Sequence, residues 1–296
     1  MSDVIRRFDR DLSSATSHRR RDRAINAFIW SAALLVTLFF AWLLFDLVRH
    51  GYERLDWAFL TTEPRSSGRK GGIYPILVST VAILAIAIAV ALPLGLATAV
   101  LLVEFLPANH RMASVISLSL DVLAGIPSIV FGLFGNVLFS VWLGLGFSIL
   151  SGGLTLACMA LPIMIRTTEA GLRMVPSDWR RGAAALGMSR ATALINILLP
   201  AAAPAIVAGV MLGIGRAAAE TAALVFTSGY VDRMPESFSD SGRALAVHIY
   251  DLSMNVSGGD AAAYASAIVL IVVIMLINTL ALALTDYWLA RRITPS

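Results

Sequence analysis

The sequence predicts an all-α polytopic membrane protein with six transmembrane helices. Hydrophobic residues make up 58% of the chain, only 14% of its residues are charged, and its mean hydropathy is +0.79. A soluble domain usually carries about 25% charged residues. Four long runs contain no Asp, Glu, Lys or Arg, namely 74–103, 122–165, 191–215 and 261–285. Such runs match the interior of a bilayer and not the interleaved pattern of a soluble core.

The positions of the six helices follow from the length that a membrane-spanning helix needs. A span takes about 20 apolar residues at a rise of 1.5 Å each. The run 122–165 is too long for one span, and the glycines and serines between residues 144 and 153 mark a break that divides it. The expected helices are 25–48, 74–102, 113–139, 151–172, 201–228 and 262–289.

The N-terminal region favours a retained first helix over a cleavable signal peptide. Its first 24 residues contain seven Arg and four Asp, and the apolar run that follows is about long enough to cross a membrane by itself. We therefore expect an N-terminal tail at 1–24, a transmembrane domain at 25–290 and a C-terminal tail at 291–296.

The distribution of basic residues predicts the orientation in the membrane. With the N-terminus in the cytoplasm, the inner segments carry about twice as many Arg and Lys residues as the outer ones. Positive charge gathers on the cytoplasmic side of membrane proteins, so both tails are expected there. The outer segment 229–260 contains acids, Gly, Ser and Pro, which predicts a solvated loop with a short helix near 243–252.

Several function classes are excluded by what the sequence lacks. It has no G-x-x-x-x-G-K-[ST] phosphate-binding loop, so a transporter built from it needs a separate ATPase. Its four histidines are scattered and Cys158 is the lone cysteine, which disfavours a metal site or a disulfide framework. Membrane topology explains the arginines better than a nucleic-acid footprint does, so no nucleic acid is expected.

The cytoplasmic loop 173–200 predicts two short helices between membrane spans. Pro176 ends the preceding helix, Ser177 can cap a new one, and Gly187 is suited to a left-handed C-cap. A second short helix can begin at Ser189 and run toward the next span. The two helices would form a compact knob that another protein could bind, whereas the alternative is a plain connecting loop rich in Ala and Gly.

This loop resembles the signature loop of the inner-membrane permeases of binding-protein-dependent ABC importers, written E-A-A-x-x-x-G and followed nine residues later by I-x-L-P. The matching residues are Ala183, Gly187, Ile197, Leu199 and Pro200, and Ala184 lies between the alanine and the glycine of the motif. Arg181 occupies the glutamate position, so a salt bridge made through that acid is absent or reversed here. The resemblance implies that the loop, including Ser177 and Arg181, couples the chain to an ATPase.

Two charged residues within the fifth expected helix form a candidate substrate site. Arg216 and Glu220 are four residues apart, which places them on one helical face. An ionisable side chain at this depth costs about 2.5–3.5 kcal/mol on insertion scales and therefore suggests a function. The guanidinium suits a tetrahedral oxyanion, and the glutamate could neutralise it between passages. A structural ion pair is an equal alternative.

Three further intramembrane charges predict structural ion pairs. Asp121 and Arg166 lie at similar depths and could pair between the third and fourth helices. Arg166 and Glu169 are three residues apart near a membrane end, where such pairs often serve as interface anchors.

The fifth expected helix also has a stripe of small residues on one face. The residues Ala205, Gly209 and Gly213 form this stripe, which would let another helix or a pore approach closely.

Other segments sharpen the resemblance and extend it over residues 74–290. The segments 123–135, 161–170 and 213–224 resemble motifs of phosphate-specific permeases, most closely those of the PstA type. The third places Arg216 and Glu220 at the family's charged pair, although Ala223 stands where the family has proline. Residues 126–128, Ile-Pro-Ser, break a helix in mid-membrane, which is tolerated where the backbone lines a cavity.

The resemblance implies the fold and partners of a type I ABC importer in the bacterial inner membrane. The chain itself would be no enzyme and would hold no cofactor or metal. Its partners would be a PstC-like permease, a PstB-like ATPase dimer carrying ATP and Mg, and a PstS-like protein delivering inorganic phosphate, with lipid around the helices.

Two alternatives to a phosphate permease stay open on the residues. A permease for another oxyanion, such as phosphonate, sulfate or molybdate, has the same charged pair available. A membrane-embedded phosphotransferase or lipid phosphatase would need clustered acids or a His-Arg catalytic set, which the scattered residues do not supply.

Overall fold

The computed structural model describes the backbone of residues 2–107 and 109–293, with side chains for 22–23, 25–107 and 109–287. The chain forms two compact units, Met1–His50 and Gly51–Ser296. The first unit consists of helix α1 (Ser2–Gly51), which contains the expected span 25–48. The predicted tail 1–24 is helical from Ser2 onward, because no glycine or proline interrupts the sequence before Gly51.

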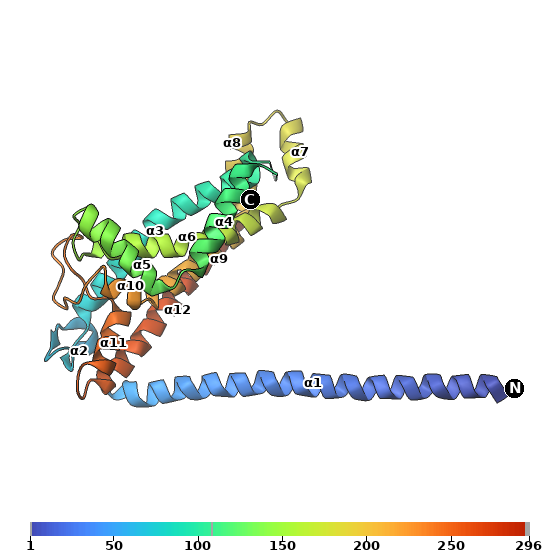
Figure 1. The fold of residues 1–296 in the computed structure, drawn as a ribbon, viewed down its shortest axis with the longest axis horizontal. Helices are drawn as coiled ribbons and strands as arrows, with labels where there is room; N and C mark the ends of the chain where they lie inside the picture. Colours follow the sequence, from blue (N-terminus) through green and yellow to red (C-terminus); the bar gives the residue numbers. More distant parts are fainter. Residues whose placement is uncertain (1, 108, 294–296) are drawn as a thin grey trace. The chain divides into compact units, whose positions relative to one another are not determined.

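The second unit consists of membrane helices with a small outer cap (Figure 1). The cap contains η1 (Tyr52–Arg54), α2 (Trp57–Thr61), the antiparallel pair β1 (Pro64–Arg65) and β2 (Lys70–Gly71), and α11 (Leu245–Met254). The membrane elements are α3 (Tyr74–Val100), η2 (Leu101–Phe105), α4 (Arg111–Gly125), α5 (Ser128–Gly135), η3 (Asn136–Trp142), α6 (Ile149–Met174), α9 (Leu199–Ala218), α10 (Ala222–Val225) and α12 (Asp260–Ile293). The segment from α7 (Ser177–Ala185) through α8 (Arg190–Ala193) and η4 (Leu194–Leu198) connects α6 to α9.

Five helices of the described chain are long and apolar enough to cross a membrane, and a bent pair supplies a sixth candidate. The bent pair is α4 with α5 and η3, where the expected helix 113–139 turns by 105°. Ile126 and Pro127 are both extended at this bend. Proline donates no backbone hydrogen bond and disfavours a helical residue before it, so the helix ends there.

The expected helix 201–228 needs correction at both ends. A single helical segment runs from Arg190 to Ala218, through a π-helical turn at η4, so no separate short helix lies before Pro200. The helix stops at Ala218, and the chain makes a turn before the short helix α10. At the other end of the chain, α12 continues the span 262–289 into the expected tail, and residues 294–296 lie outside the described part.

Helix α6 is the centre of the second unit. Within its most apolar window, 67% of the residues are buried, against 6% for α12. Its two flanking helices, α3 and α9, approach it through small residues. A β-carbon added at Gly171 would collide with Ala205 of α9, and one at Gly209 would press on Thr167 and Met164 of α6. The small-residue stripe of α9 therefore serves contact with α6.

A first prediction tests this close packing with two glycines. Gly171→Ala should destabilise the folded protein by about 1–3 kcal/mol, because the added methyl group meets a neighbouring helix and forces a backbone shift. Gly215→Ala in α9 adds its methyl group in open space, so the same substitution should be neutral or stabilise the helix by up to about 1 kcal/mol. Thermal unfolding in detergent would measure both, and equal shifts for the two variants would contradict the packing argument.

The outer cap is held by a buried polar cluster around Arg243. The guanidinium donates from Nε to the carbonyl of Tyr230 at 2.8 Å and from Nη1 to Asp251 Oδ2 at 3.1 Å. Nη1 also lies 3.4 Å from Nδ1 of His248, a fully buried side chain. The turn between the two strands packs against this imidazole, because a β-carbon on Gly68 would collide with it.

Burial and the positive charge of Arg243 lower the pKa of His248 from its ordinary value of 6.5 to about 4, against the opposing attraction of Asp251. When the cap opens locally and exposes His248 to water, the imidazole binds a proton more readily than it does in the folded cap. The stability that neutral His248 contributes is therefore present above pH 6.5 and lost as the pH falls toward 4, by up to about 1.4 kcal/mol per pH unit.

A second prediction follows for the outer cap. Hydrogen exchange of α11 amides, corrected for intrinsic rates, should show weaker protection at pH 5 than at pH 6.5. His248→Gln should flatten this dependence because glutamine does not titrate. The control His110→Gln, at the start of α4, should leave it unchanged. A wild-type protection that is constant over this interval would be incompatible with a buried neutral imidazole.

Candidate functional site

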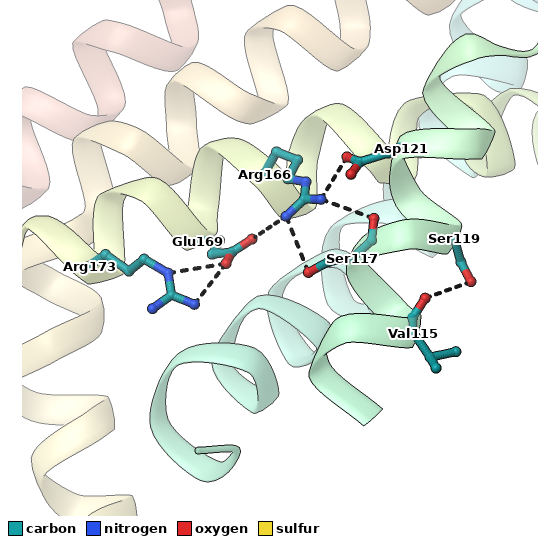
Figure 2. A network of polar contacts seen from close by, with 7 residues as sticks. All are labelled: Val115, Ser117, Ser119, Asp121, Arg166, Glu169 and Arg173. Atoms are coloured by element: carbon teal, nitrogen blue, oxygen red, sulfur yellow. Dashed lines mark hydrogen bonds and ion pairs between the residues drawn. The ribbon is translucent and has the colours of Figure 1, made fainter. Parts of the chain in front are cut away.

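A chain of four charged residues joins α4 to α6 (Figure 2). Arg166 binds Asp121 at 2.7 Å between Nη2 and Oδ1, and Glu169 at 3.1 Å between Nη1 and Oε2. Arg166 also donates from Nη2 to the carbonyl of Ser117 at 3.0 Å. On its other side, Glu169 accepts two hydrogen bonds from Arg173, at 3.1 and 2.9 Å.

The structure thus brings together the three residues expected to form ion pairs and adds Arg173. The Glu169 carboxylate is the most deeply buried member, with 11% of its side chain exposed, and it is bound from both sides. Two arginines and two acids alternate, so the chain of contacts carries no net charge. Because each buried charge has a partner, the network links α4 to α6 without leaving an unpaired ion in the membrane.

A cavity of about 250 Å³ lies beside this network, between α4, α5, α6 and α9. Its charged lining residues are Asp121, Arg166 and Arg216. Arg216 is exposed and forms no ion pair with any residue that the structure describes. Arg166 is balanced by its carboxylate partners, so the positive balance of this cavity comes from Arg216, whose donors are available for an anion.

The expected pairing of Arg216 with Glu220 is wrong. Helix α9 ends at Ala218, so the two residues no longer share a helical face. Instead the Glu220 carboxylate accepts a hydrogen bond from the backbone N–H of Ala223 at 3.2 Å, at the start of α10. Glu220 therefore stabilises the turn after α9, and Arg216 faces the cavity without it.

The loop 173–200, called the coupling segment after the role that the sequence resemblance implies, contains one separate short helix, α7, and the start of the next membrane helix. Pro176 is its N-cap residue and makes no side-chain cap, so the expected capping role of Ser177 is wrong and Ser177 is the first helical residue. The C-terminal end follows the expectation. Gly187 has a φ of +72°, and the N–H groups of Gly187 and Met188 donate to the carbonyls of Ala184 and Ala183. These two bonds form a Schellman cap.

The second half of the expected knob belongs to the membrane helix. Ser189 caps it by accepting from Thr192 N–H at 3.1 Å, and the helix then continues without a break into α9. Ile197 and Leu199 pack against a core cluster shared with α3, α4 and α6, and Pro200 lies in the first turn of α9. These residues anchor the segment in the membrane domain and are not its exposed face.

The exposed face of α7 includes side chains that the sequence pattern did not single out. Ala184 is exposed whereas Ala183 is buried. Trp179 and Leu186 are large apolar residues with 49% and 81% of their surface exposed, which suits a protein contact. Arg181, at the family's glutamate position, forms an ion pair with Asp178 one turn earlier.

A second interaction that sequence reasoning missed attaches α7 to the membrane helices. Arg180 binds Glu104 of η2, with 2.6 Å between Nη2 and Oε1. The two residues are 76 positions apart, so no local spacing points to their contact. The available signal was that Glu104 ends the charge-free run 74–103, which places an acid at the membrane end nearest the arginine-rich loop.

The fold and site together define a class of transport protein. The structure is similar to a chain of the MetNI methionine ABC transporter in an inward-facing conformation, with a TM-score of 0.56 and 17% sequence identity. The match covers 73% of this chain and 94% of that chain. A second crystal form of the same transporter matches with a TM-score of 0.53. The chain has the fold of a type I ABC importer permease.

The chain belongs to the family of binding-protein-dependent transport system inner membrane components, whose model matches residues 91–294. A probable ABC transporter permease of Bacillus subtilis, YqgI, is 32% identical to this chain, and the match covers 83% of this chain and 87% of YqgI. The phosphate transport system permease PstA 1 of Mycobacterium tuberculosis is also 32% identical, and the match covers 93% of this chain and 91% of that permease.

Membership fixes several general properties. The protein is a multi-pass component of the inner membrane and a transport subunit that is not itself catalytic. A binding-protein-dependent ABC transporter implies a separate binding protein and a separate ATPase as partners.

Proposed function

We propose that this chain is the PstA-type permease subunit of an ATP-driven importer of inorganic phosphate. The observation that carries the proposal is Arg216, an arginine without an ion pair in a membrane cavity where Arg166 adds a second guanidinium. A guanidinium offers a planar fork of donors that fits the oxygens of a tetrahedral oxyanion.

One paired arginine and one unpaired arginine suit an anion path. Arg166 is bound by Asp121 and Glu169, so little of its charge is available to a passing anion. Arg216 is left to attract the anion, while Asp121 on the cavity wall keeps the net attraction low. Transport needs binding that is strong enough for entry and weak enough for release.

The extent of the similarity supports the PstA role over the PstC role. The PstA 1 permease of M. tuberculosis aligns over 93% of this chain, whereas a PstC 1 permease of Mycobacterium bovis is 36% identical over 54%. In this proposal a PstC-like permease forms the other half of the path. A PstB-like ATPase dimer holds ATP and Mg, and a PstS-like protein delivers phosphate.

The proposed orientation places both termini and α7 in the cytoplasm. Helices α7 and α8 lie at one end of the second unit, and α12 runs toward that end (Figure 1). Helix α7 contains Arg180 and Arg181, and α8 contains Arg190. The cap of α2 and α11 lies at the opposite end, where a binding protein would dock. Positive charge on the cytoplasmic side agrees with this orientation.

A third prediction tests the substrate site. Arg216→Ala should lower phosphate import by about 10- to 100-fold, the effect of losing a hydrogen bond to a charged group. Assembly should be preserved because Arg216 is exposed and pairs with no described residue. Uptake of labelled phosphate by the complete complex in proteoliposomes measures the effect, and Arg233→Ala in the outer loop is the matched control.

The same assay separates phosphate from other cargo. The wild-type complex is offered phosphate, sulfate and a phosphonate on their binding proteins. Uptake of sulfate or phosphonate in place of phosphate would make the chain a permease for another oxyanion. Normal phosphate uptake by Arg216→Ala would remove Arg216 from the path.

A fourth prediction tests the coupling segment with two exposed glycines. An alanine at Gly187 would be forced into a left-handed conformation that costs about 1–2 kcal/mol, although nothing lies within 4 Å of the new methyl group. Gly187→Ala should therefore distort the end of α7 and reduce the amount of ATPase that co-purifies with the permease.

Gly182→Ala is the matched control, because Gly182 is helical, has equally open surroundings and stands where the family motif has alanine. It should leave ATPase retention intact. Equal retention by both variants and the wild type would show that the conformation of this segment does not matter for docking.

A further inference from the structure

Arg180 of α7 binds two other parts of the structure at once, η2 and the end of α6. Its Nε donates to both carboxylate oxygens of Glu104, at 3.1 and 3.2 Å, and Nη2 donates to Oε1 at 2.6 Å. Nη2 also donates to the carbonyl of Leu172 at 2.9 Å, and Nη1 to that of Val175 at 2.8 Å. One side chain of α7 therefore ties together the end of α3, through η2, and the end of α6.

The position of these contacts makes the connection rigid. The last carbonyls of a helix have no partner within it, and a cation near the C-terminus interacts favourably with the helix dipole. At the end of α6, Arg180 supplies both the hydrogen-bond donors for these carbonyls and the positive charge. Its side chain is 29% exposed and that of Glu104 is 16% exposed, so water screens the pair only in part. A bidentate guanidinium–carboxylate contact also fixes the angle between the two groups.

Helix α7 contacts α8 and η4, and Arg180 fixes its direction relative to α3 and α6. Val175 between α6 and α7 is extended and Pro176 is also non-helical, which makes this junction a natural pivot. Ala183 is the buried residue of α7, and its small side chain gives a limited contact. Arg180 lies one turn after the pivot, where it prevents α7 from swinging away from α3 and α6.

We infer that Arg180 and Glu104 form the joint through which movement of α7 is transmitted to α3 and α6. The inference rests on the proposed docking of an ATPase at α7. A force on the exposed face of α7 then moves α3 and α6 with it as one body. Arg180 and Glu104 are positioning residues, since neither needs to touch the substrate.

The first test measures the joint directly and needs no cargo. Spin labels are placed on Ala185→Cys in α7 and Phe105→Cys in η2, both exposed positions, in a Cys158→Ser background within the complete complex. The wild-type pair should give one narrow distance distribution that is the same without nucleotide and with ATP, Mg and vanadate. Arg180→Ala should broaden it in both states. A distribution that stays narrow in Arg180→Ala overturns the proposal.

The second test measures coupling as phosphate imported per ATP hydrolysed. Glu104→Ala and Arg180→Ala should each lower this ratio by at least about 5-fold, the lower end of typical coupling between sites. The double variant should fall no further than Arg180→Ala, because both substitutions remove the same contact. Wild-type ratios in both single variants would overturn the proposal.

The matched control is Arg233→Ala. Arg233 binds Asp240 at 3.1 Å, but both residues belong to the loop between α10 and α11, so breaking this contact separates no membrane helices. Its import per ATP should equal that of the wild type. If the alanine variants fail to assemble, Glu104→Gln and Arg180→Lys are held to the same criteria, with a smaller loss expected for the lysine variant because it keeps one ion pair.

Failure of the proposed function gives a different pattern from failure of the joint. A wild-type complex that imports no phosphate, or a permease that retains no ATPase, contradicts the proposed function. The distance distribution in the absence of nucleotide still decides whether Arg180 holds α7 against η2.

Discussion

The close contact of α6 with its neighbours is the constraint on which the rest of the second unit depends. In a bilayer the hydrophobic effect gives helices no reason to associate, so packing and polar contacts must hold them together. At Gly171 an added methyl group would collide with Ala205 of α9, and at Gly209 one would press on Thr167 and Met164 of α6. Much of the proposed site lies on this helix, because α6 carries Arg166 and Glu169, lines the cavity, and ends where Arg180 binds its carbonyls. Arg216 lies on α9, which packs against α6.

The intramembrane charged residues differ in whether they have an ion-pair partner, and this difference distinguishes structural residues from the proposed functional one. Arg166 and Glu169 are each bound by two oppositely charged side chains, so their desolvation is compensated within the protein. Arg216 lacks such compensation among the described residues, yet it lies at a membrane cavity. An exposed, unpaired guanidinium at that depth is costly for a protein that only needs to fold. That cost separates Arg216 from the structural pairs and is the reason for proposing it as the residue on which an anion path depends.

Composition was enough to find the spans, because length and apolarity alone decide what fits a bilayer. The break at Pro127 and the cap at Gly187 were also predictable, since each depends on the conformational limits of a single residue. The end of α9 was not. No glycine or proline follows Ala218 directly, and the turn depends on Glu220 reaching the N–H of Ala223. The outer strand pair was missed for a similar reason, because its turn places Ser66 and Ser67 at positive φ, which serine rarely adopts.

Contacts between distant positions were the least accessible to the sequence. Arg180 lies next to Arg181, which the family motif draws attention to, but only the folded chain shows that Arg180 is the one that reaches Glu104. Where two helices end at the membrane surface, no sequence spacing decides which side chains meet. Any of several arginines in the loop 173–200 could therefore have paired with Glu104. The signature segment of the family thus divides by burial: Ile197 and Leu199 belong to the core, while Ala184 and the exposed apolar residues of α7 are left for a partner.

The continuous helix from Arg190 to Ala218 connects the two proposed ends of the transport mechanism. It begins at the coupling segment, where Ser189 caps it, and carries Arg216 in its last turn. At 1.5 Å per residue the distance from Arg190 to Arg216 along the helix is about 40 Å. Helix α9 packs on α6 through its small residues. Arg180 attaches α7 to the end of α6. The short segment that contains α7 therefore joins the end of α6 to the start of the helix that leads into α9. In the proposed mechanism a displacement of α7 therefore acts on both walls of the cavity, the wall that carries Arg166 and the wall that carries Arg216.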